Sequence, residues 1–198
     1  MANAIRPSGL TPVKNLNGAP WSGQANVYYI AAADTNAYAI GDPVVSSGSA
    51  DSNGIPGITL AAATGAIRGV VVGLGTSPNL IANPSNLDTT IRPSGANSKA
   101  YYALVVDDPH VIFAVQEPGS GGTALTAAAT ALNVNLVVGT NNGYISGWTL
   151  SNSGAATTNT LQMKLLGLAQ VQNNSFGYAA TWLTLINNHE LNAGTTGV

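Results

Sequence analysis

The segment Asp107-Asp108-Pro109-His110 brings two carboxylates and an imidazole close together in the sequence. A carboxylate beside an imidazole can relay a proton, and the pair can supply two ligands to a metal ion. The same residue types are also typical of exposed turns, where Asp accepts nearby backbone N–H groups and Pro fixes one dihedral angle. We therefore interpret the segment as a turn. A hydrolase that uses Asp107, Asp108 and His110 is the least favoured alternative.

No other segment offers a convincing catalytic motif. His189 and Glu190 are adjacent, and neighbouring strand residues point to opposite faces, which disfavours a shared metal. The glycine-rich segment 119–122 lacks the following Lys-Ser/Thr of a phosphate loop, and no Gly-x-Ser-x-Gly elbow is present. Nothing selects Glu117 and the aspartates of the turn as a glycosidase pair. The sequence predicts no catalytic, cofactor-binding or metal-binding residue and no enzymatic activity.

The elements that would position these groups must be built from an unusually charge-poor chain. Only 7% of the 198 residues are charged, against about 25% in ordinary soluble domains. The net charge is −2 and the six basic residues are scattered, so we expect no nucleic-acid partner. This composition predicts a surface that lies against other protein.

Cysteine is absent, which excludes disulfides and thiolate metal sites and is typical of a chain made in a reducing cytoplasm. No apolar run approaches the roughly 18 residues of a membrane span, so we expect no membrane partner. The first residues also lack the apolar core of a secretory signal. We expect the chain to function where it is made or in an assembly built there.

Short segments rich in β-branched and aromatic residues recur at even spacing, separated by Gly, Asn and Pro. They predict an all-β fold, either a jelly-roll-like sandwich or a Greek-key barrel. Segments 107–110 and 139–142 are predicted hairpin turns, and the Ala-rich segment 123–132 is predicted to form one short helix or turn. The predicted strands are 27–30, 37–40, 44–45, 58–60, 67–74, 100–106, 111–116, 133–138, 143–150, 160–171 and 180–187.

Two regions do not fit this β pattern. Residues 1–24 are rich in Pro and predict an extended N-terminal arm, whose apolar side chains would dock on the domain or on a neighbouring molecule. Residues 25–198 are predicted to form a single β domain, interrupted at about 76–98 by a long surface excursion. As partner contacts we predict Ile5, Leu10, Trp21, Leu80 and Ile81.

The Trp and Tyr residues allow another reading, because aromatic rings can form a stacking platform for sugars. Since most of them lie within predicted strands, packing in a core or an interface is favoured. A glycan- or receptor-binding surface protein remains the alternative function.

Several segments of the sequence resemble one known family, the cement or head-decoration proteins of tailed bacteriophages. The resemblance is spread over most of the chain and is thinnest across residues 76–97. The segments that carry it are 6–12 (RPSGLTP), 28–44 (from YYI through GDPV), 124–139 (ALTAAATALNVNLVVG), 156–168 (ATTNTLQMKLLGL) and 182–189 (WLTLINNH).

The resemblance implies a structural virion protein that binds the outside of the capsid and stabilises contacts between subunits of the major capsid protein. It also implies a β-rich homo-oligomer without a cofactor, made in the host cytoplasm and carried on the outer surface of the capsid. The arm is the kind of segment that can lie along a neighbouring subunit, using its backbone donors and acceptors.

Overall fold

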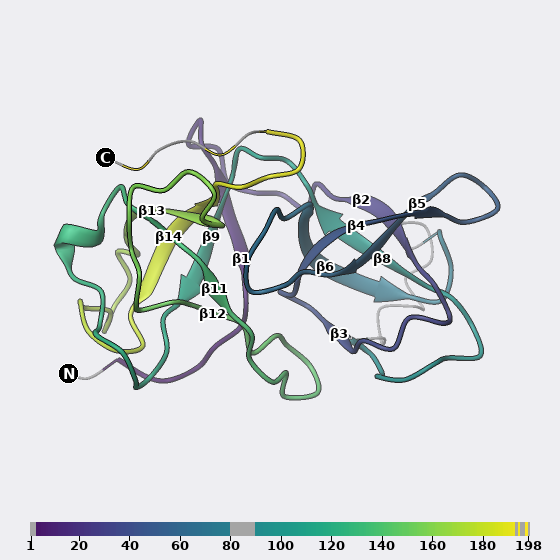
Figure 1. Cartoon of the computed structure of the whole chain (residues 1–198), viewed down its shortest axis with the longest axis horizontal. Helices are drawn as coiled ribbons and strands as arrows, with labels where there is room; N and C mark the ends of the chain where they lie inside the picture. The colour runs from purple at the N-terminus through teal and green to yellow at the C-terminus, as the bar shows by residue number, and fades with distance from the viewer. Residues whose placement is uncertain (1–2, 80–89, 193, 195–196, 198) are drawn as a thin grey trace.

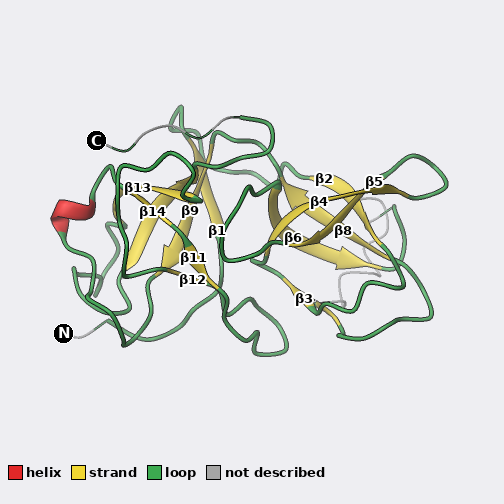
Figure 2. Ribbon diagram, viewed as in Figure 1, coloured by secondary structure: helices red, strands yellow, loops and turns green. Residues whose placement is uncertain are grey.

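The computed structural model describes residues 3–79, 90–192, 194 and 197. Its strands form two lobes that lie side by side (Figure 1). Figure 2 shows that strands and loops account for nearly all of the fold, which confirms the predicted all-β class. The helix predicted at 123–132 is a single 3-10 turn, η2 (Ala127–Ala129). None of the described helices has the length and apolar character that crossing a membrane requires.

One lobe, which we call the sheet lobe, is a five-stranded antiparallel sheet beside a short two-stranded ladder. The strand predicted at 180–187 is present, and its side chains alternate: Trp182, Thr184 and Ile186 are buried while Leu183 and Leu185 are partly exposed. The sheet contains, in spatial order, β1 (Thr11–Asn15), β9 (Val111–Gln116), β14 (Thr181–Ile186), β13 (Met163–Leu168) and β10 (Asn133–Val134), and the ladder contains β11 (Leu136–Val137) and β12 (Thr149–Leu150).

The other lobe, which we call the barrel lobe, is a closed barrel of five strands. In the β-branched segment at 69–75, Val70 and Val71 are both fully buried. The first and third strands in chain order pair in parallel, and the other neighbours are antiparallel. The barrel contains β2 (Asn26–Ile30), β5 (Pro56–Leu60), β4 (Pro43–Ala50), β6 (Gly69–Gly75) and β8 (Tyr101–Val106), and β3 (Tyr38–Ala39) pairs separately with β7 (Ile91–Arg92).

The prediction of a hairpin at 107–110 is wrong, because the strands on its two sides do not pair with each other. Strand β8 pairs with β2 and β6 in the barrel, whereas β9 pairs with β1 and β14 in the sheet. The turn therefore carries the chain from one lobe to the other. Its Asp and Pro residues favour a change of direction, but they do not select the partner of either strand. Strands β11 and β12 do pair in antiparallel fashion on either side of the predicted turn at 139–142.

The two lobes share one hydrophobic core. Phe113 and Trp182 from the sheet lobe belong to the same buried cluster as Ile67, Val70 and Val106 from the barrel side. Fully burying a side chain of this kind contributes about 1.5–3 kcal/mol. A second cluster fills the barrel interior around Tyr28 and Ile30.

The predicted arm forms part of the sheet lobe. Residues 11–15 are β1, an edge strand, where Pro12 is tolerated. The chain then folds back, and the backbone N–H groups of Asn15 and Trp21 donate to Ala19 and Val13, so the outer edge of β1 is covered. At the opposite edge, Asn133 of β10 exchanges backbone hydrogen bonds with Ala156.

A close backbone approach fixes the chain just before β1. Gly9 has φ +63°, and a Cβ atom there would lie 2.3 Å from the carbonyl oxygen of Gly41. Only glycine fits such a position without strain. This contact holds the start of the sheet lobe against the turn that precedes β4.

Part of the predicted surface excursion is anchored in the barrel lobe. Arg92 of β7 is fully buried, and its guanidinium donates to the backbone carbonyl of Ala31 over 3.2 Å and also to that of Asn36. The guanidinium carbon also lies 5.6 Å and 5.7 Å from the ring centroids of Tyr38 and Tyr101. At a buried position such as this, backbone carbonyls accept hydrogen bonds from the guanidinium, and the faces of aromatic rings attract its positive charge.

Candidate functional site

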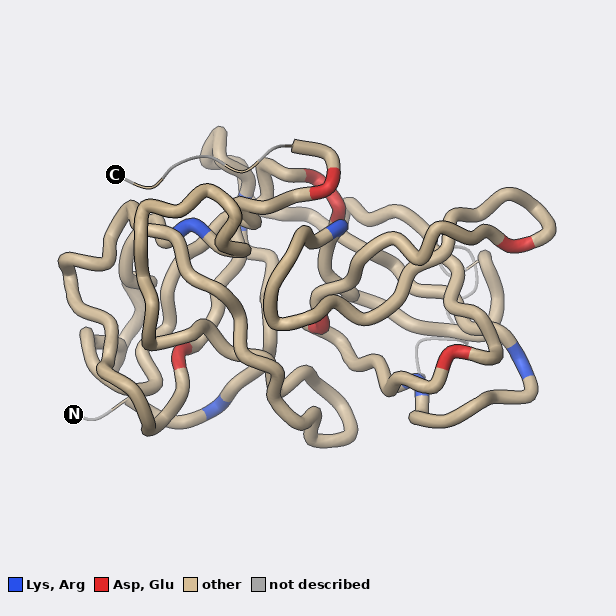
Figure 3. Tube along the Cα trace, in the orientation of Figure 1, with Lys and Arg blue, Asp and Glu red and all other residues tan. Residues whose placement is uncertain are grey.

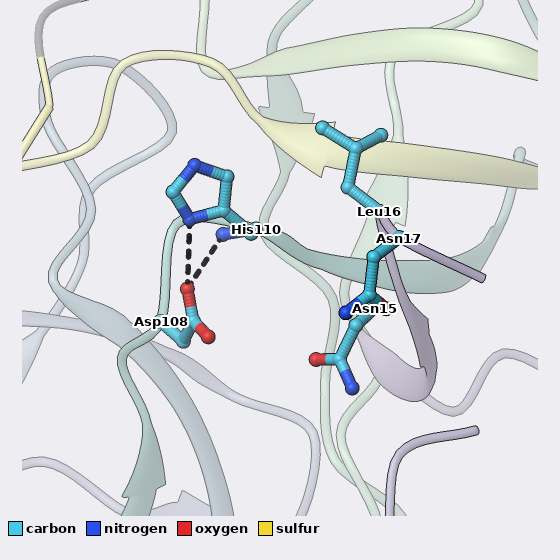
Figure 4. Close-up of a pocket in the computed structure, with 5 residues that line it drawn as sticks. All are labelled: Asn15, Leu16, Asn17, Asp108 and His110. Carbon is cyan, nitrogen blue, oxygen red and sulfur yellow. Dashed lines mark hydrogen bonds and ion pairs between the residues drawn. The ribbon is translucent and has the colours of Figure 1, made fainter. Parts of the chain in front are cut away.

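The turn that the sequence singled out lies beside a hollow of about 510 Å³, drawn in Figure 4. The Oδ1 atom of Asp108 accepts the backbone N–H of His110 over 2.8 Å and lies 3.2 Å from its Nδ1 atom. Both side chains are largely exposed. Leu16 and its two asparagine neighbours face this pair from the turn after β1 (Figure 4). The carboxylate thus caps its own turn, as the sequence interpretation expected.

Asp107 faces away from this hollow and into the junction between the two lobes, which we call the lobe junction and where Asn26, Tyr28 and Arg68 surround it. Its Oδ2 atom accepts the hydroxyl of Tyr28 over 2.6 Å, and its Oδ1 atom accepts the amide of Asn26 over 2.8 Å. The Arg68 guanidinium lies 3.6 Å from the same carboxylate and donates to the Tyr28 hydroxyl. Burial, reinforced by Asp107, raises the pKa of Tyr28 to about 12. Asp107 therefore has a structural set of partners that does not include His110.

The other buried carboxylates also accept hydrogen bonds from N–H groups of the surrounding protein. Glu117 accepts the backbone N–H of Leu125 over 3.0 Å and the indole N–H of Trp182 over 3.3 Å. Asp42 accepts the backbone N–H of Ala39 over 2.7 Å. Burial raises the pKa of both carboxyl groups. Within the described ranges, no three His, Cys, Asp or Glu side chains are grouped closely enough to hold a metal ion.

His189 lies where the chain leaves β14 and meets the barrel lobe. It is only 3% exposed, its Nδ1 atom accepts the backbone N–H of Leu191 over 3.0 Å, and its buried Nε2 atom has no hydrogen-bond partner. Burial, and then the nearby Arg68 charge, lower the pKa of the imidazole. Glu190 turns the other way and accepts the hydroxyl and backbone N–H of Ser46. The two side chains do not converge on one site.

The predicted contact residues differ in their exposure and in what they pack against. Ile5 is 65% exposed and lies over Gly119, so it is available to a partner. Trp21 is partly buried against the shared core, and its indole N–H donates to the carbonyl of Gln24. Leu80 and Ile81 lie outside the described residues.

Leu10 was wrongly predicted as a partner contact. It is 1% exposed and belongs to the shared core. Its backbone N–H donates to the carbonyl of Gly41 over 3.0 Å, which draws the side chain under the sheet as β1 begins. An apolar residue in an arm can anchor the arm to its own domain as well as to a neighbour, and here it does the former.

Sequence reasoning missed three exposed apolar residues on a loop that contacts the N-terminal segment through Asn3. Val171, Phe176 and Tyr178 are exposed on the loop after β13. The sequence placed residues 160–171 in one strand, but β13 ends at Leu168 and the chain then forms a loop that reaches the N-terminal residues. We call residues 3–6 together with 171–179 the end face.

Side-chain amides hold the two segments of the end face together. The Asn3 amide donates to the carbonyls of Ser175 and Tyr178 over 2.8 Å and 2.9 Å. The Gln116 amide accepts the backbone N–H of Arg6 and donates to the carbonyl of Ala4. Residues far apart in the sequence thereby form one surface, with a hollow of about 480 Å³ between them.

Charge is distributed unevenly between the lobes (Figure 3). Residues 118–163 include no Asp, Glu, Lys or Arg, and Lys164 is the one charged residue between 118 and 189 when His is taken as neutral. Arg68 and Asp107 form an ion pair at the junction instead, and Glu190 accepts a hydrogen bond from Ser46 of the barrel lobe. The outer part of the sheet lobe is therefore nearly free of charge.

The aromatic residues are divided between the core and the surface. Trp148 and Trp182 are 2% and 0% exposed and belong to the shared core, which is the packing role that the sequence favoured. Tyr144 and Tyr178 are exposed, but they lie on different loops.

Comparison with known proteins gives no further identification. No family model, no curated protein and no solved structure matches this chain.

Proposed function

We propose that this chain is a structural virion protein that binds the outside of a tailed-phage capsid and stabilises contacts between its major capsid protein subunits. The observation that carries the proposal is the nearly uncharged outer part of the sheet lobe, which exposes apolar side chains such as Val171, Phe176 and Tyr178. Several exposed apolar side chains on one loop are a feature of surfaces that contact other proteins. The resemblance of the sequence to capsid cement proteins supports the same role.

The arrangement of ionisable groups supports a role without catalysis. Asp42, Asp107 and Glu117 accept hydrogen bonds that fix loops and the lobe junction, and each is buried. His110 and Asp108 are exposed in their own turn. The proposed protein therefore acts by binding.

An uncharged contact surface suits a protein present in many copies on a shell. Polar but uncharged groups can hydrogen-bond across an interface without the desolvation cost of buried ions. If the chain acts as a homo-oligomer, several weak contacts on one shell add through multivalency. The stabilisation of the shell then exceeds the strength of any single contact.

The test is a comparison of shells with and without this chain. Shells that lack it should rupture at a lower temperature, and adding the purified chain back should restore the rupture temperature. Rupture can be followed by release of packaged DNA to a fluorescent dye. Equal rupture temperatures in the presence and absence of the chain, at saturating concentration, would contradict the proposal.

A further inference from the structure

We infer that the end face, residues 3–6 and 171–179, is the surface that docks on the shell, and that its partner is an uncharged protein surface carrying one carboxylate opposite Arg6. The inference rests on the proposed function and adds the face, the residues and the chemistry of the contact.

The end face combines large apolar exposure with a hollow. Ile5 is 65% exposed, Val171 61%, Phe176 45% and Tyr178 44%. Of these four, Val171 lines the hollow of about 480 Å³ between the two segments, together with amide side chains that include Asn3 and Gln116. Interfaces are typically built in this way, with aromatic and aliphatic anchors beside groups that hydrogen-bond.

The anchors are already held in position. The Tyr178 hydroxyl donates to the carbonyl of Gly122 over 3.1 Å, and the Phe176 ring lies 5.5 Å from the Trp182 ring. Asn3 and Gln116 fix the N-terminal segment through their amides. Since these groups are ordered before binding, little conformational entropy is lost when a partner arrives.

Arg6 defines the charge that the partner must match. Its side chain is the one charged group of the end face, and no described carboxylate lies within ion-pair distance of it. Burying an unpaired guanidinium is costly, so a tight contact requires an acceptor from the partner. Elsewhere the partner should be uncharged, because nothing on the end face would pair with further ions.

The same charge argues against a second copy of this chain as the occupant. A two-fold contact places the same patch on both sides of the interface. Two end faces in contact would place two Arg6 side chains in the interface with no carboxylate from either face. A single cation is also too little for nucleic acid, which requires several converging basic groups.

The test uses three variants of the full chain and shells prepared without it. Val171→Asp and Arg6→Glu alter the end face. The matched control is Val13→Asp, which places the same charge on an exposed valine of β1 outside the end face. Circular dichroism and gel filtration establish that each variant is folded.

Binding is measured by co-sedimentation with the shells. We expect Val171→Asp and Arg6→Glu to weaken binding about tenfold or more, as for interface anchors, and Val13→Asp to change it less than about twofold. If the end-face variants bind like the wild type, or if Val13→Asp binds as poorly as they do, the inference is overturned while the proposed function stands. If the wild-type chain fails to bind the shells, the proposed function itself is wrong.

The oligomeric state gives an independent check of the partner. Light scattering should show the same mass for the wild type and for Val171→Asp. A loss of oligomers in Val171→Asp would mean that the end face joins copies of this chain, and would overturn the assignment to the shell.

Discussion

At the scale of single residues, the lobe junction contains a buried histidine with an incomplete set of hydrogen-bond partners. The Nδ1 atom of His189 accepts the N–H of Leu191, so the neutral ring carries its proton on Nε2, which has no partner. A second proton would have to enter at Nδ1 and would break the bond to Leu191. Arg68 opposes this charge, while Asp107, Glu190 and Asp108 favour it.

This arrangement predicts a specific dependence of stability on pH. Burial lowers the pKa of folded His189 below its ordinary value of 6.5. As the pH falls below about 6.5, the unfolded chain binds a proton that the folded chain does not. The contribution of His189 to the free energy of unfolding is therefore fully present above that pH and is lost as the pH falls toward the folded pKa.

We expect the stability of the wild type to fall more steeply between pH 7.5 and pH 5 than that of His189→Asn, which keeps an acceptor near the position of Nδ1. Urea denaturation at several pH values measures the difference. His110→Asn, at an exposed position, is the matched control and should follow the wild type. Parallel pH profiles for the wild type and His189→Asn would refute this account.

At the scale of elements, β1 depends on the buried side chain that precedes it. Leu10→Ala should lower the free energy of unfolding by about 2–5 kcal/mol, because it leaves a cavity in the shared core. Ile5→Ala should change it by no more than about 0.5 kcal/mol, since that side chain is largely exposed. Urea titration followed by tryptophan fluorescence measures both. Similar losses in the two variants would contradict the assignment of Leu10 to the core.

Local patterns in the sequence predicted most strands, because burial follows β-branched and aromatic residues. They did not predict β1, since Pro12 argued against a strand and only its edge position makes it tolerable. The predicted strand 160–171 starts too early, because β13 begins at Met163 and Gln162 just before it is fully buried. Its amide donates to the carbonyl of Ala62 and accepts the N–H of Leu136. These partners come from distant segments that the local pattern does not contain.

The end face was predictable only in part, for the same reason. Ile5 was predicted as a partner contact, but Phe176 and Tyr178, which share the end face with it, come from the far end of the sequence. The Asn3 amide that joins the segments bonds a carbonyl 175 positions away. Spacing along the chain carries no information about such a contact when no regular strand pairing links the two segments.

At the scale of the whole molecule, the shared core predicts that the lobes unfold together. Phe113 and Trp182 of the sheet lobe lie in one cluster with Val70 and Val106 of the barrel, so neither lobe can open without exposing apolar surface of the other. Calorimetry should show one transition, with equal calorimetric and van't Hoff enthalpies.

Two spectroscopic signals test this cooperativity lobe by lobe. Trp21, Trp148 and Trp182 all belong to or pack against the shared core on the sheet side, so tryptophan emission follows that lobe. Tyrosines such as Tyr28 and Tyr38 lie in the barrel cluster. The tryptophan signal of the sheet lobe and the tyrosine signal of the barrel lobe should change at the same temperature. Two separated midpoints would mean that the lobes are independent units.

The covered strand edges have a consequence for solubility. A net charge of −2 gives molecules of this chain little mutual repulsion, so they can approach closely at high concentration. An open strand edge would then template intermolecular β pairing and aggregation. The return of residues 19–21 onto β1, the pairing of Ala156 with β10 and the closure of the barrel remove such templates. The chain can therefore accumulate to high local concentration without depending on charge to stay dispersed.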